Sequence, residues 1–254
     1  MVRAISFIYH IWYYIMGFVT IVALLPFLLV AAQPWVPYRY FFGLGRVWGV
    51  LYLLSLGIVP WPKRNRHELP EGPFVLAPNH SSDLDIPMTF VFSPRPVVFM
   101  GKAELLKLPI FGFFFRKTSI PVDRSTYSGR KKAMEMADQA VKAGSSVCIY
   151  PEGGIPPHTH LLRSFKAGAF KLALDNDVPV VPSVIYDMKR RFGDWNRPCS
   201  PGICRTEVLA PLRPKMDCED PVGELSDRTY MAIGTRLKAH GYTGKEALPL
   251  PSRN

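Results

Sequence analysis

An uncharged apolar stretch from Ile5 to Ala32 constrains the fold of this chain more than any other feature. It is dominated by Ile, Phe, Tyr, Val and Leu, and it contains no Asp, Glu, Lys or Arg. A membrane-spanning helix needs about 20 apolar residues, whereas the apolar region of a cleaved signal peptide has about 7 to 15. The stretch therefore predicts a membrane-associated helix, with signal cleavage after Ala32 and a helix of a soluble core as the alternatives.

A second apolar stretch, residues 40–61, follows a short turn that contains two prolines. We expect the two stretches to form a helical hairpin. Arg46 lies within the second one, and an arginine near the centre of a bilayer costs about 2.5 to 3.5 kcal/mol on insertion scales. A shallow hairpin in one leaflet would let this side chain reach the headgroups, so we favour it over a double span. The expected domains are this hairpin with a basic linker, residues 1–66, and a second domain, residues 67–254.

The charge of the chain is strongly positive, with 31 Lys and Arg residues against 20 Asp and Glu. Such a surplus indicates an anionic partner: a nucleic acid, an acidic carrier protein, a phosphate-bearing substrate or an anionic membrane surface. The basic residues are dispersed and match no nucleic-acid recognition motif, so we expect no nucleic acid. The four cysteines form no Cys-x-x-Cys pair, which favours reduced thiols facing a cytoplasm-like compartment.

From Pro70 onward, short apolar runs bounded by Pro or Gly alternate with charged helical stretches. This alternation is typical of an α/β domain with a mostly parallel sheet flanked by helices, in which sites gather beyond the carboxyl ends of the strands. The expected strands span residues 74–77, 97–100, 119–122, 146–150, 178–185 and 206–211, and the expected helices span residues 85–91, 127–143 and 165–175.

The segment Asn-His-Ser-Ser-Asp-Leu-Asp, residues 79–85, leaves the first expected strand and begins a helix. His80 and Asp85 lie five positions apart, so they can meet across the first turn of that helix. An aspartate that accepts from Nδ1 fixes the tautomer of the histidine and leaves Nε2 to take a proton from an attacking hydroxyl. The alternative is a structural turn in which the Ser and Asp side chains only cap the helix.

This first segment, Asn-His-x-x-x-x-Asp after a short apolar strand, resembles the first motif of the glycerolipid acyltransferase family, which includes the lysophosphatidic acid acyltransferases. Three later blocks are similar to motifs of that family in the same order, and the resemblance covers residues 74–185. The blocks are Phe-Gly-Phe-Phe followed by Thr-Ser-Ile-Pro-Val-Asp-Arg within residues 111–124, Tyr-Pro-Glu-Gly-Gly-Ile-Pro at residues 150–156, and Val-Pro-Val-Val-Pro-Ser at residues 178–183.

The resemblance implies roles for individual residues. His80, Asp85 and Glu152 would form the catalytic set, with His80 as the base. Arg124 would hold the phosphate of the acceptor, because a guanidinium makes paired, charge-assisted hydrogen bonds to phosphate oxygens. Lys102, just after an expected strand, would add a second positive contact.

The third block departs from the family pattern, with Gly154 where threonine is frequent and Ile155 where arginine is frequent. One customary phosphate contact is therefore missing, which leaves the identity of the acceptor open. Arg163 and Lys166 lie shortly downstream at the entrance of an expected helix, and we expect them to supply the lost charge. Asn79, Gly153 and Gly154 complete the expected substrate-binding residues.

We expect no metal and no other cofactor. Pro-Pro-His-Thr-His, residues 156–160, has no matching Cys or carboxylate pattern, so a plain loop is favoured over a metal site. A metal held by His80, Asp83, Asp85 and Glu152 is the alternative for these groups, but the family resemblance implies none. The sequence carries no signal for an oligomeric state.

The expected activity is transfer of a fatty acyl group from acyl-CoA or acyl-carrier protein to the hydroxyl of a lysophospholipid, first of all 1-acylglycerol-3-phosphate. No Gly-x-Ser-x-Gly motif is present, which favours direct attack by the acceptor over an acyl-enzyme. Acylation of another lysolipid, such as an N-acyl amino acid lipid, and a non-catalytic lipid-binding role are the alternatives. The partners would be membrane lipids at the cytoplasmic face of the inner or cell membrane, with Lys63, Arg64 and Arg66 against anionic headgroups.

Overall fold

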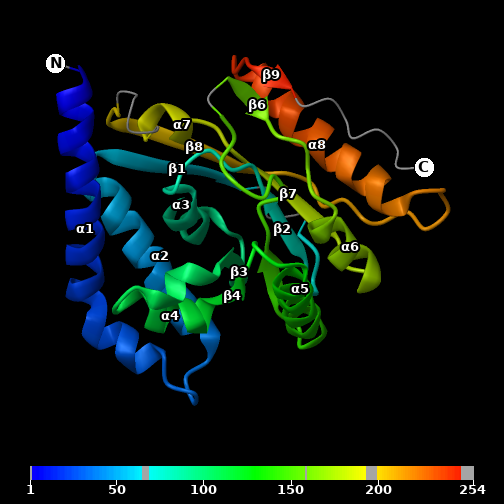
Figure 1. Ribbon diagram of the computed structural model, residues 1–254, viewed down its shortest axis with the longest axis horizontal. Helices are drawn as coiled ribbons and strands as arrows, with labels where there is room; N and C mark the ends of the chain where they lie inside the picture. The colour runs from blue at the N-terminus through cyan, green and yellow to red at the C-terminus, as the bar shows by residue number, and fades with distance from the viewer. Residues whose placement is uncertain (1, 65–68, 158, 193–198, 247–254) are drawn as a thin grey trace. The chain divides into compact units, whose positions relative to one another are not determined.

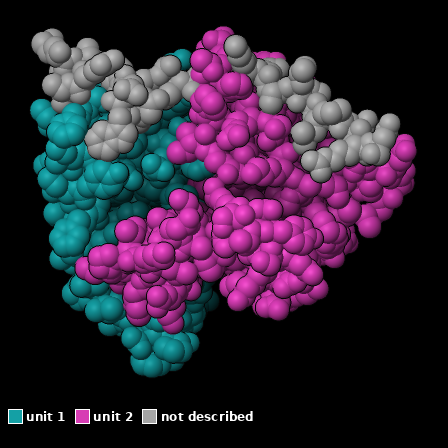
Figure 2. All heavy atoms as spheres, viewed as in Figure 1, with its two compact units in different colours: residues 1–64, 80–94, 185–207 teal, residues 65–79, 95–184, 208–254 magenta. Residues whose placement is uncertain are grey.

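The computed structural model describes residues 2–64, 69–157, 159–192 and 199–246. The chain divides into two compact units, which Figure 2 distinguishes by colour. Unit 1 consists of residues 1–64, 80–94 and 185–207, and unit 2 of residues 65–79, 95–184 and 208–254. Residues 65–68, where the expected domain boundary and Arg66 lie, are outside the described residues, as is His158.

Unit 1 begins with the long helix α1, Val2–Ala31, followed by α2, Tyr38–Ser55 (Figure 1). Within α1, the segment Ser6–Ala31 is long and apolar enough to cross a membrane, with a mean hydropathy of 2.4. Many of its large apolar side chains are exposed, among them Phe18 and Phe27. The expected apolar N-terminal helix is therefore present.

The expected two-helix membrane hairpin is not confirmed, because α2 packs within unit 1. One face of α2 is buried against helix α3, Asp85–Phe92. A Cβ on Gly45 would come within 2.6 Å of the Phe90 ring, and one on Gly49 within 2.6 Å of the Pro87 carbonyl oxygen. Glycine at these two positions therefore allows the close approach of the helices.

Arg46 on α2 binds the carboxyl end of α3. Its Nε donates to the carbonyl oxygen of Phe90 at 3.1 Å, and its Nη2 donates to that of Ser93 at 2.7 Å. Carbonyl groups in the last turn of a helix lack partners within the helix, and a cation there also complements the helix dipole. Partial burial lowers the pKa of Arg46 from its ordinary value. The prediction that Arg46 reaches lipid headgroups is therefore wrong, because its side chain binds the end of α3.

The predicted extent of the second apolar helix, residues 40–61, is also wrong, because α2 ends at Ser55. After α2 the chain turns at Gly57, which has a φ of +68°, and continues as strand β1, Ile58–Arg64. Strand β8, Gly202–Val208, is the neighbour of β1 in the sheet. The backbone amide of Gly202 donates to the Gly57 carbonyl oxygen at 2.8 Å. The apolar character of residues 58–61 therefore belongs to a strand.

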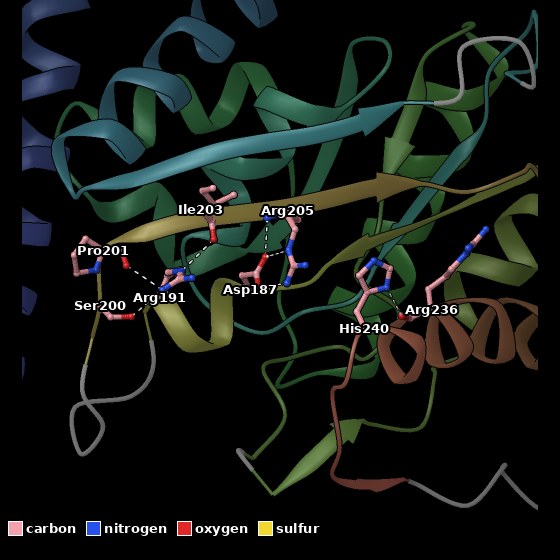
Figure 3. A network of polar contacts seen from close by, with 8 residues as sticks. All are labelled: Asp187, Arg191, Ser200, Pro201, Ile203, Arg205, Arg236 and His240. Atoms are coloured by element: carbon pink, nitrogen blue, oxygen red, sulfur yellow. Dashed lines mark hydrogen bonds and ion pairs between the residues drawn. The ribbon is translucent and has the colours of Figure 1, made fainter.

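Hydrogen bonds of Asp187 and Arg191 join β8 to the short helix α7, Met188–Arg191. Figure 3 shows Asp187, which accepts from Nη2 of Arg205 at 2.8 Å, and Arg191, which donates to the carbonyl oxygen of Ile203 at 3.1 Å. Glu207 is also buried, and it pairs with Lys63 at 3.1 Å. Lys63, predicted to contact headgroups, is therefore engaged in an ion pair.

Unit 2 contains five parallel strands in the order β7-β2-β5-β3-β4. Val75 of β2 pairs with Val147 of β5 on one side and Val180 of β7 on the other. The central strands are buried on both faces, as the apolar runs of parallel strands require. The predicted mostly parallel sheet is confirmed. The strands are β2, Val75–Pro78; β3, Val97–Lys102; β4, Ser119–Val122; β5, Ser146–Cys148; and β7, Val180–Ile185.

Helices flank this sheet (Figure 1). Thr126 caps α5, because its hydroxyl accepts from the Gly129 amide at 3.0 Å, and Asp220 caps α8 in the same way. The sequence predicted α5 and α6 but not α4 or α8. The helices are η2, Ala103–Lys107; α4, Phe111–Thr118; α5, Tyr127–Lys142; α6, Gly168–Asp175; and α8, Pro221–Ala239, with a two-stranded sheet of β6, His160–Leu162, and β9, Lys245–Glu246.

Candidate active site

The first motif follows strand β2. Asn79 lies at the carboxyl end of β2, where its backbone amide donates to the Ser183 carbonyl oxygen at 3.3 Å. The chain continues into unit 1 as a turn that leads to α3. Nδ1 of His80 lies 2.9 Å from Oδ2 of Asp85, the first residue of that helix. The structure therefore brings together the two residues that the five-residue spacing predicted to meet.

Asp85 is held by several donors as well as by the histidine. The backbone amides of Ser81 and Ser82 donate to Oδ2, and the hydroxyl of Ser81 donates to Oδ1 at 3.2 Å. The Asp85 side chain is fully buried, whereas that of His80 is 15% exposed. A carboxylate fixed in this way holds the imidazole with Nδ1–H toward Asp85, so Nε2 is the ring nitrogen that takes up a proton.

The capping that was the structural alternative is not found, since no side-chain hydrogen bond caps α3 at its N-cap residue, Leu84. The hydroxyl of Ser82 accepts from the Leu84 amide at 3.3 Å. Burial raises the pKa of Asp83, an effect that His80 opposes and Asp85 reinforces. The serine hydroxyls therefore hold the turn and the Asp85 carboxylate in place.

In unit 2, the third motif follows β5 at the same edge of the sheet as Asn79, since parallel strands end together. Gly153 has a φ of +68°, in the left-handed region that favours glycine. Glu152 is 1% exposed, and its Oε2 accepts from the Arg163 backbone amide at 2.8 Å. The Lys166 amide donates to the Pro151 carbonyl oxygen at 2.8 Å. Two hydrogen bonds therefore close the base of the loop that carries Arg163.

Three cationic side chains surround the two glycines of this motif. Nη1 of Arg124 donates to the Gly153 carbonyl oxygen at 3.0 Å. A Cβ on Gly153 would lie 2.7 Å from Nζ of Lys166, and one on Gly154 would lie 3.8 Å from Nη1 of Arg163. The structure thus gathers the three basic residues around the two glycines that precede Ile155, the residue that replaces the family's usual arginine. We call these three residues the Gly153 cluster.

Lys102 ends β3 and pairs with Glu104, with 3.5 Å between Nζ and Oε1. Its strand register places it opposite Val122, two residues before Arg124. It therefore lies at the sheet edge from which Arg124 emerges. Lys102 and Glu104 are both exposed, so their ion pair contributes little stability.

Within the part of the chain that the structure describes, no group of three or more His, Cys, Asp or Glu side chains is arranged to hold a metal ion. His160 begins β6, where its Nδ1 lies 3.1 Å from the Thr159 hydroxyl. His158, the other histidine of this predicted loop, lies outside the described residues.

Sequence reasoning did not predict the amides of Ser81 and Ser82 as ligands of Asp85, nor the bond between Glu152 and the Arg163 backbone. The first had a usable signal, since an aspartate at the start of a helix commonly accepts from nearby amides. The second joins residues 11 positions apart through the closure of a loop. No local pattern in the sequence marks such a contact.

Comparison with known proteins identifies the family of the chain. A family model described as Acyltransferase matches residues 62–186. The mouse 1-acyl-sn-glycerol-3-phosphate acyltransferase alpha is 30% identical over 191 residues, which cover 73% of this chain and 67% of the mouse protein. The chain belongs to the Acyltransferase family. It is therefore an enzyme that transfers acyl groups.

Two further relatives extend the likeness of this acyltransferase beyond the matched segment. The 1-acyl-sn-glycerol-3-phosphate acyltransferase of Saccharomyces cerevisiae is 26% identical over 240 residues, 89% of this chain and 74% of the yeast protein. The crystal structure of the 1-acyl-sn-glycerophosphate acyltransferase PlsC from Thermotoga maritima has a TM-score of 0.79 at 21% identity, and the match covers 96% of this chain and 100% of that one. The whole fold of the acyltransferase, including its N-terminal part, is thus shared.

Proposed function

We propose that this acyltransferase moves a fatty acyl group from acyl-CoA or acyl-carrier protein to the free hydroxyl of 1-acylglycerol-3-phosphate, giving phosphatidic acid and a free thiol. The observation that carries the proposal is the contact of 2.9 Å between Nδ1 of His80 and Asp85. The names of the mouse and yeast relatives support the choice of acceptor.

In the proposed reaction, Nε2 of His80 takes the proton of the acceptor hydroxyl while the hydroxyl oxygen attacks the thioester carbonyl carbon. Collapse of the tetrahedral intermediate breaks the carbon–sulfur bond, and the proton on His80 passes to the leaving thiolate. Asp85 stabilises the transient imidazolium and keeps its orientation. The backbone amides of Ser81 and Ser82 donate to Asp85, so they fix the carboxylate that orients His80. We therefore do not assign them to the stabilisation of the oxyanion.

The Gly153 cluster is the proposed site for the acceptor's phosphate. Arg124, Arg163 and Lys166 bring three positive charges to two glycines that expose backbone rather than side chain. A phosphate dianion is a suitable ligand because guanidinium and ammonium groups both form charge-assisted hydrogen bonds with it. The positive charge absent at Ile155 is supplied from the downstream loop in this proposal.

Ile155 also favours a second acceptor, a lysolipid without a phosphomonoester, such as an N-acyl amino acid lipid. An isoleucine that is 41% exposed stands where an arginine would bind phosphate. A carboxylate-bearing acceptor needs fewer cationic partners than a phosphate dianion. This reaction would use the same base and the same thioester donor.

Membrane association through α1 completes the proposal. The helix exposes apolar side chains over a length sufficient to cross a bilayer, and both substrates carry acyl chains. Bringing an acyl chain into water costs about 0.8 kcal/mol per methylene, so an enzyme at the membrane surface avoids a large barrier. The four free cysteines are compatible with the cytoplasmic face.

The test is thiol release by the purified full chain in phospholipid vesicles, with 1-acylglycerol-3-phosphate compared with 1-acylglycerol and with an N-acyl amino acid lysolipid. Both acyl-CoA and acyl-carrier protein are supplied as donors in parallel. His80→Ala should lower kcat about 10²-fold to 10⁴-fold, the usual contribution of a general base. His240→Ala is the matched control, because this histidine binds the Arg236 carbonyl oxygen on the exposed end of α8 (Figure 3).

Each result has a defined meaning. Release that depends on His80 and requires the phosphate supports the proposed acceptor. A preference for an N-acyl amino acid lysolipid would move the assignment to the second acceptor. Undiminished release by His80→Ala would overturn the mechanism, and no release with any donor or acceptor would favour the non-catalytic alternative.

A further inference from the structure

A surface segment of unit 2, residues 107–117, includes most of α4 (Figure 1). It combines exposed apolar side chains with positive charge. It consists of the end of η2, a tight turn and most of α4. Between Leu105 and Val122 the sequence contains three basic residues and no Asp or Glu. This local surplus is notable because α4 contributes nothing to the His80–Asp85 pair or to the Gly153 cluster.

The inner side of this segment is well anchored. Phe114 and Phe115 are buried, and the Phe115 ring lies so close to Gly101 that a Cβ there would be 2.7 Å from it. A Cβ on Gly112 would collide with the carbonyl group of Leu106, so glycine lets the turn fold onto the helix. The segment is therefore a fixed part of unit 2, and its outer side has a defined composition.

The outer side presents three large apolar residues to solvent. Leu108 is 49% exposed, Ile110 is 37% exposed and Phe113 is 44% exposed. The exposed cations Lys107, Arg116 and Lys117 flank them. On the helix, positions 113, 116 and 117 share one face because they are three and four residues apart. Apolar residues with a basic border are the composition by which proteins bind the interface of an anionic bilayer.

The turn keeps Ile110 at the surface despite an unfavourable backbone. Ile110 has a φ of +61°, and the Phe111 amide donates to the Pro109 carbonyl oxygen at 2.6 Å, which defines a γ-turn. Turns of this hand are rare and strained, and a β-branched residue is poorly suited to positive φ. Glycine would suit the backbone better. The exposed apolar side chain is the property that isoleucine adds here.

We infer that this surface, which we call the α4 face, docks on an anionic phospholipid bilayer as a contact separate from α1. Leu108, Ile110 and Phe113 would enter the boundary between headgroups and acyl chains. Lys107, Arg116 and Lys117 would bind lipid phosphates, and each cation near an anionic surface strengthens binding about fivefold. An acidic carrier protein would also be attracted by the charge, but the three bulky apolar residues favour a lipid interface.

The test measures the immersion of the α4 face in the full chain, so that binding through α1 does not obscure it. Cys199 and Cys218 are the half-buried thiols and are replaced by serine, whereas Cys148 and Cys204 are buried. A nitroxide is attached at Phe113→Cys, and a control nitroxide at Met231→Cys on the exposed side of α8. Collisions with oxygen and with a water-soluble nickel chelate report depth in vesicles of phosphatidylcholine with phosphatidylglycerol.

The nitroxide at position 113 should become accessible to oxygen and protected from nickel, while the one at position 231 stays aqueous. Replacing Lys107, Arg116 and Lys117 by glutamine should shift position 113 toward water in vesicles that contain phosphatidylglycerol. Ile110→Gly should weaken immersion without lowering the thermal stability, because glycine relieves the turn. An aqueous signal at position 113 in these vesicles, or protection that requires added acyl-carrier protein, would overturn the inference.

Discussion

The carboxylate of Glu152 accepts a hydrogen bond from the backbone amide of Arg163 at 2.8 Å. We propose that Glu152 is a positioning residue for the Gly153 cluster, because Arg163 and Lys166 leave the loop that this contact closes. The sequence resemblance placed Glu152 in the catalytic set. Its burial at 1% exposure and its bond to the loop favour an indirect role.

Substitution of Glu152 separates these two roles. Glu152→Gln keeps a side-chain oxygen that can accept from the Arg163 amide, whereas Glu152→Ala removes it and leaves a partly buried donor without this partner, at a cost of about 1 kcal/mol. We expect Glu152→Ala to raise KM for the phosphate-bearing acceptor and Glu152→Gln to restore it largely. Steady-state kinetics with varied acceptor measures the split. An equal loss of kcat in both variants would instead indicate that the carboxylate takes part in the chemistry.

Asp85 should affect kcat more than acceptor binding. Asp85→Asn removes the negative charge that stabilises the imidazolium and disturbs the tautomer of His80, which should lower kcat about 10²-fold to 10⁴-fold. The KM for the acceptor should change little, since Asp85 is fully buried. Asp83→Asn is the control for charge near the same histidine. Comparable losses of kcat in both variants would contradict the specific role of Asp85.

The local parts of this architecture were predictable from sequence. The strand Ser119–Val122 has the expected bounds, and the His80–Asp85 contact follows from a spacing that a single turn can close. Strand β1 was missed because its apolar residues continue those of α2. Gly57, at positive φ before the β-branched pair Ile58 and Val59, was the available signal, since glycine commonly ends helices in this way.

Contacts between distant segments were not predictable. Arg46 binds carbonyl oxygens 44 and 47 residues away, and nothing near it in the sequence marks them. The three basic residues of the Gly153 cluster were named from the family resemblance and from the absence of the usual arginine, but the contact that places them was not. The closure of the loop at Glu152, which brings that charge to the glycines, depends on tertiary structure.

Removal of Arg46 should destabilise the packing of α2 on α3. Arg46→Met keeps much of the apolar stem but leaves the carbonyl oxygens of Phe90 and Ser93 without these donors, which should lower the free energy of unfolding by about 1 to 3 kcal/mol. Arg39→Met is the matched control, because Arg39 is exposed and its guanidinium lies against the side chain of the neighbouring Tyr40. Denaturant unfolding in detergent measures both. Equal stability of the two variants would show that the capping contact is unimportant.

Two aspartates should change stability with pH in opposite directions. Hydrogen bonds from Ser125 and Thr126 hold the pKa of Asp123 below its ordinary value. Its stabilising contribution is therefore complete above the pKa of the unfolded chain and is lost as pH falls through the folded pKa. Partial burial raises the pKa of Asp227, and repulsion from the nearby carboxylates of Asp220 and Glu224 raises it further. The ionisation of Asp227 therefore opposes folding at neutral pH.

Asp123→Asn should accordingly lower Tm at pH 7, and this deficit should shrink at pH 3, where the wild-type carboxylate becomes protonated. Asp227→Asn should raise Tm at pH 7 and have a smaller effect at pH 3, because the repulsion among the acidic groups of α8 has then disappeared. Calorimetry of both variants and the wild type at the two pH values measures these differences. Shifts in Tm of the same size at both pH values would mean that packing changes, rather than the ionisation of these carboxylates, cause the effect.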